Sequence, residues 1–398
     1  MKVDLEPAAV RGFRFAGVSA GLKTAAGALD LGLIVADRPA SAAAVFSANR
    51  VKAAPVYVTA ERVKSGRLRA VVANSGCANS FTGKAGMQLA RESCAEVARL
   101  LGCAPELVAP SSTGVIGHLY DFAKFKSGAA DASRSLREDG LGDFARAIMT
   151  TDTRPKIAST AFKAGGATIT LAGAAKGVGM ISPKMATMLG YLMTDAAIAP
   201  AALRRSLKSA LPTSFNAITV DGDMSTNDTV IIMASGAAKN RAFSTREQAT
   251  FDRAVEEISA ALARELVRDG EGATKLVSVE VRGARSPADA ERAARQIANS
   301  PLVKTAFFGC DPNVGRILMA AGSSGAHVES DRLMLWIGGV KVAASGRLLT
   351  EALAAAGAKM REREFAVRLD LRLGKSSATI LTCDLSYDYV RINAEYTT

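Results

Sequence analysis

The sequence predicts an α/β protein in which half-buried sheets are covered on the other side by helices. Two observations carry this prediction: apolar runs with the two-residue period of strands, and amphipathic runs with helical spacing between them. The 398 residues, of which 48% are hydrophobic, suffice for two domains or for one large α/β domain. We find no internal repeat, no low-complexity tract and no Pro/Ser-rich linker, so the sequence marks no clear domain boundary.

The first half of the chain begins with strand-like alternation and glycine turns, and two predicted helices follow. Lys84 to Leu101 is predicted to form a helix, because its apolar residues fall on one face and Gly102 follows as a C-cap. A second helix is expected over residues 122–136. The predicted strands of this half lie at residues 31–38, 42–49 and 69–74.

The second half has stronger helix-start signals. Pro200 opens a predicted helix that runs through Leu211, since proline is favoured in the first helical turn. Ser244 and Glu247 form a capping-box pattern before a long helix that extends to Val267. Ser286, Pro287 and Asp289 announce another helix. The predicted strands lie at residues 229–235, 276–282, 333–344 and 365–373, of which the last alternates strictly.

Composition indicates an ordinary globular protein. The net charge of +12 is spread among acidic residues, with no basic run and only 5% aromatic residues, so acidic small molecules fit better as ligands than nucleic acid. The first residues contain no apolar signal core, and no later stretch reaches about 18 charge-free apolar residues. We therefore expect a cytoplasmic location and no membrane partner. The five cysteines show no CxxC spacing and are predicted to be reduced thiols.

Several familiar kinds of chemistry lack their residues. The two histidines, His118 and His327, form no HExxH or HxxxH spacing, and no GxSxG elbow accompanies them. The GKSS run at 374–377 resembles the end of a phosphate-binding loop, but Leu369 stands where that loop requires glycine. No GxGxxG fingerprint occurs at Gly173, Gly177 and Gly179 either. We expect no metal site and no cofactor.

The most informative segment, residues 176–195, places Thr187 before an apolar run. Gly177 and Gly179 loosen the backbone, Pro183 interrupts regular structure, and residues 188–193 then read as a buried strand or the start of a helix. An Ala-Thr pair at the edge of such a run is consistent with a plain strand start. It is also consistent with a site at which the chain is cut to expose a new N-terminal threonine.

Cleavage between Ala186 and Thr187 would place a nucleophile and a base on one residue. An α-amine titrates near ~8, so an appreciable fraction is neutral at pH 7, whereas a lysine near ~10.4 is almost wholly charged. Activation of a threonine hydroxyl by its own N-terminal amine is an accepted form of nucleophilic catalysis. Such a nucleophile needs oxyanion donors. Thr113 and Gly114, within SSTGVIG at 111–117, are the candidates, although a plain Ser/Thr/Gly loop is the simpler interpretation of this run.

Several sequence blocks together resemble the ornithine acetyltransferase family of arginine biosynthesis. The resemblance spans the chain from RGFRFAGVSAGLK to the last residue. Its blocks include AKGVGMISPKMATML, NSGCANSFTG, PSSTGVIG, TTDTRPK, VDGDMSTND, DGEGATK, DPNVGR and the terminal DYVRINAEYTT. So many blocks in the same order make chance agreement implausible.

The resemblance implies a specific reaction and architecture. It implies an N-terminal-nucleophile-like acyltransferase: a layered sandwich of mixed and antiparallel sheets covered by helices. The precursor would cut itself between Ala186 and Thr187 into an α chain, 1–186, and a β chain, 187–398. An acetyl group would pass from N2-acetylornithine to glutamate by a ping-pong route through an ester on Thr187. Two α and two β chains would associate, and acetyl-CoA is an alternative donor on which the sequence does not decide.

The resemblance also assigns residues to roles. It implies that Thr113 and Gly114 form the oxyanion hole. Its implied substrate-binding residues are Thr153, Lys176, Thr187, Glu271, Asn393 and Thr398. A lysine suits a substrate carboxylate, and a glutamate suits the ornithine ammonium group. The chain departs from the family pattern at Ser182, Lys184, Met224 and Val314.

Two other functions remain open from the sequence. A related N-terminal-nucleophile aminopeptidase or amidase would pass the acyl group to water instead of glutamate. A non-catalytic, basic anion- or nucleic-acid-binding protein would leave the chain uncut and would bind polyanions in a salt-dependent way.

Overall fold

The computed structural model describes residues 1–182 and 188–395. Contacts within the chain divide it into two compact units. The first comprises Met1–Asn216 and Asp223–Leu266, and the second comprises Ala217–Gly222 and residues from Val267 onward. This division is separate from the predicted α and β chains, which depend on a backbone cut and stay a prediction.

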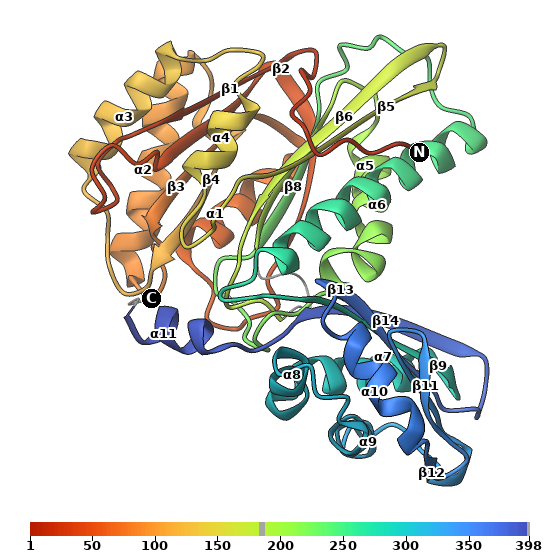
Figure 1. The fold of residues 1–398 in the computed structure, drawn as a ribbon. Coiled ribbons are helices and arrows are strands. Elements are labelled where there is room, and N and C mark those ends of the chain that lie inside the picture. Colours follow the sequence, from red (N-terminus) through yellow and green to blue (C-terminus); the bar gives the residue numbers. More distant parts are fainter. Residues whose placement is uncertain (183–187, 396–398) are drawn as a thin grey trace. The chain divides into compact units, whose positions relative to one another are not determined.

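The described part of the first unit contains an eight-stranded mixed sheet in the order β4-β3-β2-β8-β7-β6-β5, with β1 also paired to β2 (Figure 1). The β3–β4 and β7–β8 pairs are parallel, and the other pairs are antiparallel. The strands are β1 (Phe13–Val18), β2 (Leu31–Phe46), β3 (Arg67–Cys77), β4 (Val108–Val115), β5 (Lys156–Ala164), β6 (Ala167–Lys176), β7 (Leu189–Thr194) and β8 (Thr229–Ala234).

Helices cover this sheet in layers. Figure 1 shows α2 and α3 on one side of the first unit and α5 and α6 on the other. An apolar core lies between the strands and α2 and α3, and a second core joins residues of β1 to β8 with α4. The helices are α1 (Ala54–Arg62), α2 (Gly83–Leu101), α3 (Phe122–Arg134), α4 (Leu141–Ala147), α5 (Pro200–Ala210) and α6 (Thr245–Arg268). The predicted layered α/β class is confirmed.

Strand β2 is one bent strand, whereas the sequence predicted two separate strands at 31–38 and 42–49. Leu31–Ala36 pairs with β1, and Ser41–Phe46 pairs with β8. The register against β3 shifts between Val35 and Ala40, which marks the bend. Strand β2 thus pairs with β1 along its first half and with β8 along its second half.

The second unit contains, among its described residues, a six-stranded sheet in the order β12-β11-β10-β13-β9-β14. Helices α7 to α10 share one apolar core with one face of this sheet. The strands are β9 (Leu276–Ala284), β10 (Met334–Ile337), β11 (Val340–Ala344), β12 (Arg347–Leu348), β13 (Glu364–Asp370) and β14 (Ser376–Cys383). The helices are α7 (Pro287–Asn299), α8 (Pro301–Phe308), α9 (Val314–Gly322), α10 (Leu353–Lys359) and α11 (Tyr387–Glu395). Across both units, no described helix is long and apolar enough to cross a bilayer.

Candidate active site

Thr113 and Gly114 lie at the end of strand β4, whereas the sequence suggested an irregular loop or turn. Parallel pairing with β3 places Thr113 opposite Ser75 and Gly114 opposite Gly76. The strand continues because this register supplies partners for the backbone as far as Val115. The two predicted oxyanion residues are therefore held by a sheet.

Gly114 occupies a position that only glycine fits. Its φ of +127° lies in a region that residues with a side chain rarely adopt. A Cβ atom added at Gly114 would lie 2.4 Å from the carbonyl carbon of Gly76 and 2.6 Å from the backbone nitrogen of Cys77. The close approach of β3 and β4 at this point thus requires the absence of a side chain.

Lys176 ends strand β6, and its side chain reaches Thr113. The Lys176 Nζ donates to Thr113 Oγ1 at 3.0 Å and to Thr150 Oγ1 at 2.8 Å. An ammonium group can only donate, so the Thr113 oxygen accepts this bond and its own proton is directed elsewhere. The structure thus brings two predicted site residues, Lys176 and Thr113, into direct contact.

Asp152 lies next to this contact and was not singled out by the sequence analysis. Its Oδ1 accepts from Gly177 N at 2.9 Å and also binds Lys156 Nζ, and its Oδ2 accepts from Thr150 N at 3.0 Å. The Asp152 and Lys156 side chains are both 0% exposed. Burial alone would raise the pKa of the Asp152 carboxyl, but the ammonium groups of Lys176 and Lys156 lower it to about 2. The carboxylate therefore stays charged.

One signal in the sequence could have pointed to Asp152. It lies in the TTDTRPK block, from which only Thr153 was selected, and Lys156 follows it by four residues. Thr153 itself is exposed, directly after Asp152 in the segment between α4 and β5. The block therefore contains both a surface residue and the buried carboxylate beside Lys176.

Buried amides hold the ends of β3 and β4. Asn227 Nδ2 donates to the carbonyl oxygens of Ala78 at 2.7 Å and Ser112 at 2.8 Å. Ser112 Oγ donates to Asn74 Oδ1 at 2.6 Å, and Asn74 Nδ2 donates to Cys77 O at 2.9 Å. These bonds tie both strands to the segment before β8 and fix the residue that precedes Thr113.

Two further predicted residues meet in the second unit. Asn393 Nδ2 donates to Glu271 Oε2 at 2.9 Å and to Tyr389 O at 3.0 Å. Asn393 belongs to helix α11, for which the sequence analysis predicted no helix. Gly272 allows this approach, because an added Cβ would lie 2.4 Å from Tyr389 N. Glu271 and Asn393 thus form a hydrogen-bonded pair.

The cleavage site itself lies outside the described residues. Lys184, Ala186 and Thr187 belong to the undescribed segment 183–187. Thr398 belongs to a second undescribed segment, 396–398. The described chain resumes at Met188, and the following strand β7 is buried throughout, which resolves the strand-or-helix alternative in favour of a strand. Of the residues where the chain departs from the family pattern, Met224 forms an isolated bridge with Ile181.

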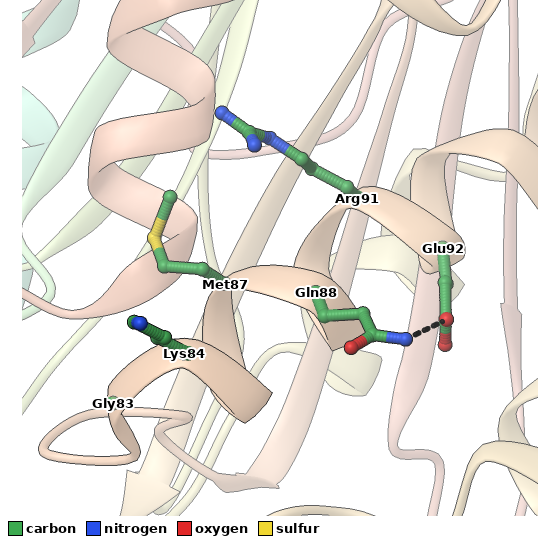
Figure 2. Close-up of a pocket in the computed structure, with 6 residues that line it drawn as sticks. All are labelled: Gly83, Lys84, Met87, Gln88, Arg91 and Glu92. Atoms are coloured by element: carbon green, nitrogen blue, oxygen red, sulfur yellow. Dashed lines mark hydrogen bonds between the residues drawn. The ribbon is translucent and has the colours of Figure 1, made fainter.

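Other features of the described surface do not contain the predicted residues. A hollow of about 630 Å³ lies over the first turns of α2, and Figure 2 shows its six lining residues and the bond from Gln88 to Glu92. Another, of about 310 Å³, includes Gly76, Cys77 and the exposed His118. Within the described residues, no group of three or more His, Cys, Asp or Glu side chains could hold a metal.

The fold and site define a class: a layered α/β protein with a buried lysine that binds the hydroxyl of a Thr-Gly strand end. Hydroxyl and backbone donors held this way are suited to stabilising an oxyanion.

Comparisons with known proteins identify the family within this class. The ArgJ family model matches residues 14–398. The arginine biosynthesis bifunctional protein ArgJ of Geobacter sulfurreducens is 52% identical over 98% of this chain and 100% of its own length. The chain belongs to the ArgJ family, which confirms the resemblance drawn from the sequence blocks.

Solved structures of relatives are also similar to this chain. The arginine biosynthesis bifunctional protein ArgJ of Bacillus halodurans is 40% identical, with a TM-score of 0.49 over 51% of this chain and 96% of that chain. The ornithine acetyltransferase of Mycobacterium tuberculosis, solved in complex with ornithine, is 37% identical, with a TM-score of 0.42 over 46% of this chain and 98% of that chain.

Proposed function

We propose that this protein transfers the acetyl group of N2-acetylornithine to glutamate through an acetyl ester on Thr187. The observation that carries the proposal is the contact between Lys176 and Thr113 at the end of β4, in a chain of the ArgJ family. This contact supports an oxyanion hole made of the Thr113 hydroxyl and the Gly114 N–H. The relatives are named as arginine biosynthesis proteins, and such a reaction serves that pathway.

The reaction proceeds in two half-reactions. The neutral α-amine of Thr187 takes the proton of its own hydroxyl, and the oxygen attacks the acetyl carbonyl of N2-acetylornithine. The tetrahedral oxyanion is stabilised by Thr113 and Gly114, and ornithine leaves with a proton returned by the amine. Glutamate then attacks the acetyl-Thr187 ester through its amino group. The acetyl group thereby passes to glutamate and Thr187 is regenerated.

Charge and hydrogen-bonding capacity support the substrate-binding roles. Lys176 and Thr153 bind the substrate carboxylate and amide, because an ammonium and a hydroxyl supply donors. Glu271 and Asn393 form one hydrogen-bonded pair, and the carboxylate of Glu271 matches the side-chain ammonium of ornithine. Thr398 completes the predicted binding set.

Maturation and assembly follow from the same proposal. The Thr187 hydroxyl attacks the Ala186 carbonyl, and hydrolysis of the resulting ester leaves an α chain and a β chain that stay associated. Two α and two β chains form the enzyme in the cytoplasm. No cofactor is needed, and acetyl-CoA serves as a second donor to glutamate, in keeping with the word "bifunctional" in the relatives' names.

The test is to trap the acetyl-enzyme. Purified protein is mixed with N2-acetylornithine alone, quenched in acid, digested and analysed by mass spectrometry. The proposal predicts an added acetyl group on the peptide that begins at Thr187, and its loss to acetylglutamate when glutamate is supplied. Release of free acetate with no acetylglutamate would instead indicate the amidase. An unlabelled Thr187 peptide in protein that transfers acetyl groups would refute the mechanism.

A further inference from the structure

We propose that Asp152 is a positioning residue of the oxyanion hole, which acts through Lys176 and Thr150 to orient the Thr113 hydroxyl. This inference rests on the function proposed above and deepens it. It gives a role to a buried carboxylate that lies in the TTDTRPK block but is not among the predicted site residues.

The hydrogen bonds of Asp152 hold two backbone segments, one next to Lys176 and one that carries Thr150. One carboxylate oxygen binds the backbone N–H of Gly177, the residue directly after Lys176. The other oxygen binds the N–H of Thr150, whose hydroxyl is the second acceptor of Lys176 Nζ. Asp152 therefore anchors the backbone that carries the donor and the backbone that carries one of its acceptors.

Charge balance provides a second link. Lys156 and Lys176 both act on the Asp152 carboxylate, and the Asp152–Lys156 ion pair is fully buried. Removing the negative charge would leave two nearby ammonium groups with less compensation in a medium that screens charge poorly. We expect the Lys176 ammonium to move away from Lys156 in that case, which would weaken its bond to Thr113.

The orientation of Thr113 explains why this matters for the reaction. While Lys176 donates to Thr113 Oγ1, the Thr113 proton can donate to a developing oxyanion. If Lys176 moves, the hydroxyl can rotate and its proton can point to other acceptors. Because the oxyanion exists only in the transition state, the loss of the Thr113 bond should appear in kcat, whereas any displacement of Lys176 from the substrate carboxylate should appear in KM.

The structure offers a matched control for a buried carboxylate. Asp195 has a side chain that is 0% exposed and binds Arg11 Nε at 2.7 Å and Thr170 N at 2.8 Å. Asp152 and Asp195 lie at opposite ends of the β6–β7 pair, since Lys176 pairs with Leu189 and Leu171 pairs with Thr194. Asp195→Asn therefore removes the charge of another buried carboxylate at a distance from Thr113, in an ion pair whose arginine is half exposed.

The test is a double-mutant cycle of Asp152→Asn and Thr113→Val. For each variant kcat is expressed per mole of cleaved enzyme, and KM is measured alongside it. We expect Asp152→Asn to lower kcat by about 10- to 100-fold, which is less than the roughly 100- to 1,000-fold cost of losing one oxyanion donor outright because the hydroxyl is misoriented and not removed. KM for N2-acetylornithine should rise as well, because Lys176 is also the proposed partner of the substrate carboxylate, so the test of positioning is made on kcat. The double variant should be no slower than Thr113→Val alone, because Asp152 acts through that hydroxyl. Asp195→Asn should keep wild-type kcat.

Each other outcome overturns the proposal. Independent, multiplicative losses would show that Asp152 acts only on general stability, and so would an equal loss in Asp195→Asn. A rise in KM at constant kcat would make Asp152 a ground-state binding residue. If wild-type protein transfers no acetyl group, the proposed function fails and this proposal fails with it, whereas an active wild type with additive variants refutes the positioning role alone.

A second pair of variants covers the case in which Asp152→Asn does not fold. Thr150→Val removes the other acceptor of Lys176, and Thr150→Ser keeps it. We expect Thr150→Val to lower kcat without adding to Thr113→Val, and Thr150→Ser to restore the wild-type rate. Equal rates for Thr150→Val and wild type would overturn the proposed route from Asp152 to Thr113.

Discussion

At the scale of single residues, Gly114 is the position with the least freedom in the proposed oxyanion hole. We predict that Gly114→Ala lowers the free energy of unfolding by about 3 kcal/mol or more, because the new methyl group meets the β3 backbone and the residue must keep a positive φ. Urea unfolding measures this change.

Gly117→Ala is the matched control for that prediction. Gly117 also has a positive φ, of +87°, but an added Cβ would meet nothing within 4 Å. Only the backbone strain remains, so we expect a loss of about 1 kcal/mol. Equal losses in the two variants would contradict the role of the β3 contact.

Asp152 gives a prediction for acid stability. Its folded-state pKa of about 2 lies below the ordinary value of 3.8, so its contribution is present above pH 3.8 and is lost as the pH falls through about 2. We expect wild-type protein to lose about 2 kcal/mol more than Asp152→Asn over this window. Urea titrations at a series of acidic pH values measure the difference. Parallel curves for the two proteins would contradict it.

Asp228 gives a prediction of the opposite sign. The residue is 1% exposed, and its burial raises the pKa of the carboxyl well above 3.8. The contribution of the neutral Asp228 carboxyl to the stability of the folded protein is therefore fully present below pH 3.8. It is lost as the pH rises through the raised pKa. We expect Asp228→Asn to flatten this decline, as measured by unfolding from about pH 4 to about pH 9. An unchanged decline would refute the assignment.

The site was only partly predictable from the sequence. Thr113 and Gly114 were candidates from the SSTGVIG run, Lys176 was named through the resemblance, and the contact of Lys176 with Thr113 gives these two a shared location. Asp152 and Thr150 were missed because their importance depends on where β5 begins and where β6 ends relative to β4. Strand register of this kind is set by pairing across the sheet, which a single sequence does not reveal.

At the scale of elements, helix starts were the most predictable feature. The Ser244–Glu247 capping box is present, with Glu247 Oε2 accepting from Ser244 N at 2.9 Å before α6. Pro200 opens α5 as predicted. These signals are local, since the cap and its partner lie within one turn of each other. Helix α11 was missed because it buries no residue among those described and so has no apolar stripe to read.

The predicted strands fall on observed strands, but β1, β4, β5, β6, β12 and β14 were not predicted, and neither were the connections. The segment 333–344 was predicted as one strand and forms the β10–β11 hairpin, which turns at Gly338 and Gly339 with φ values of +57° and +81°. Residues 31–46 showed the converse error, two predicted strands that form one. Apolar runs reveal extended backbone, whereas turns and bends depend on neighbouring strands.

The cap of α7 allows a direct test at this scale. Ser286 Oγ accepts from Asp289 N at 3.1 Å, and Pro287 occupies the first turn. We predict that Ser286→Ala lowers the free energy of unfolding by about 1 kcal/mol because the N–H loses its acceptor. Ser286→Thr keeps an oxygen and should lose less. Urea unfolding in which the alanine variant is as stable as wild type would show that the cap contributes nothing.

At the scale of the whole molecule, the chain forms two units that are interleaved in sequence. Ala217–Gly222 belongs to the second unit although it lies between segments of the first. The sequence shows no boundary because none of the three changes of unit among the described residues coincides with a Pro/Ser-rich linker. The predicted cut at Ala186/Thr187 falls within the sequence range of the first unit, so the two proposed chains would both contribute to its sheet.

The central claim is that Thr187 frees its own amine and then uses its hydroxyl as the nucleophile. The most direct measurement is the intact mass of purified, active protein and of Thr187→Ala under denaturing conditions. The account predicts two chains that meet at Ala186/Thr187 in the wild type and a single inactive chain in the variant. A full-length, uncut wild-type chain with acetyl-transfer activity would contradict it.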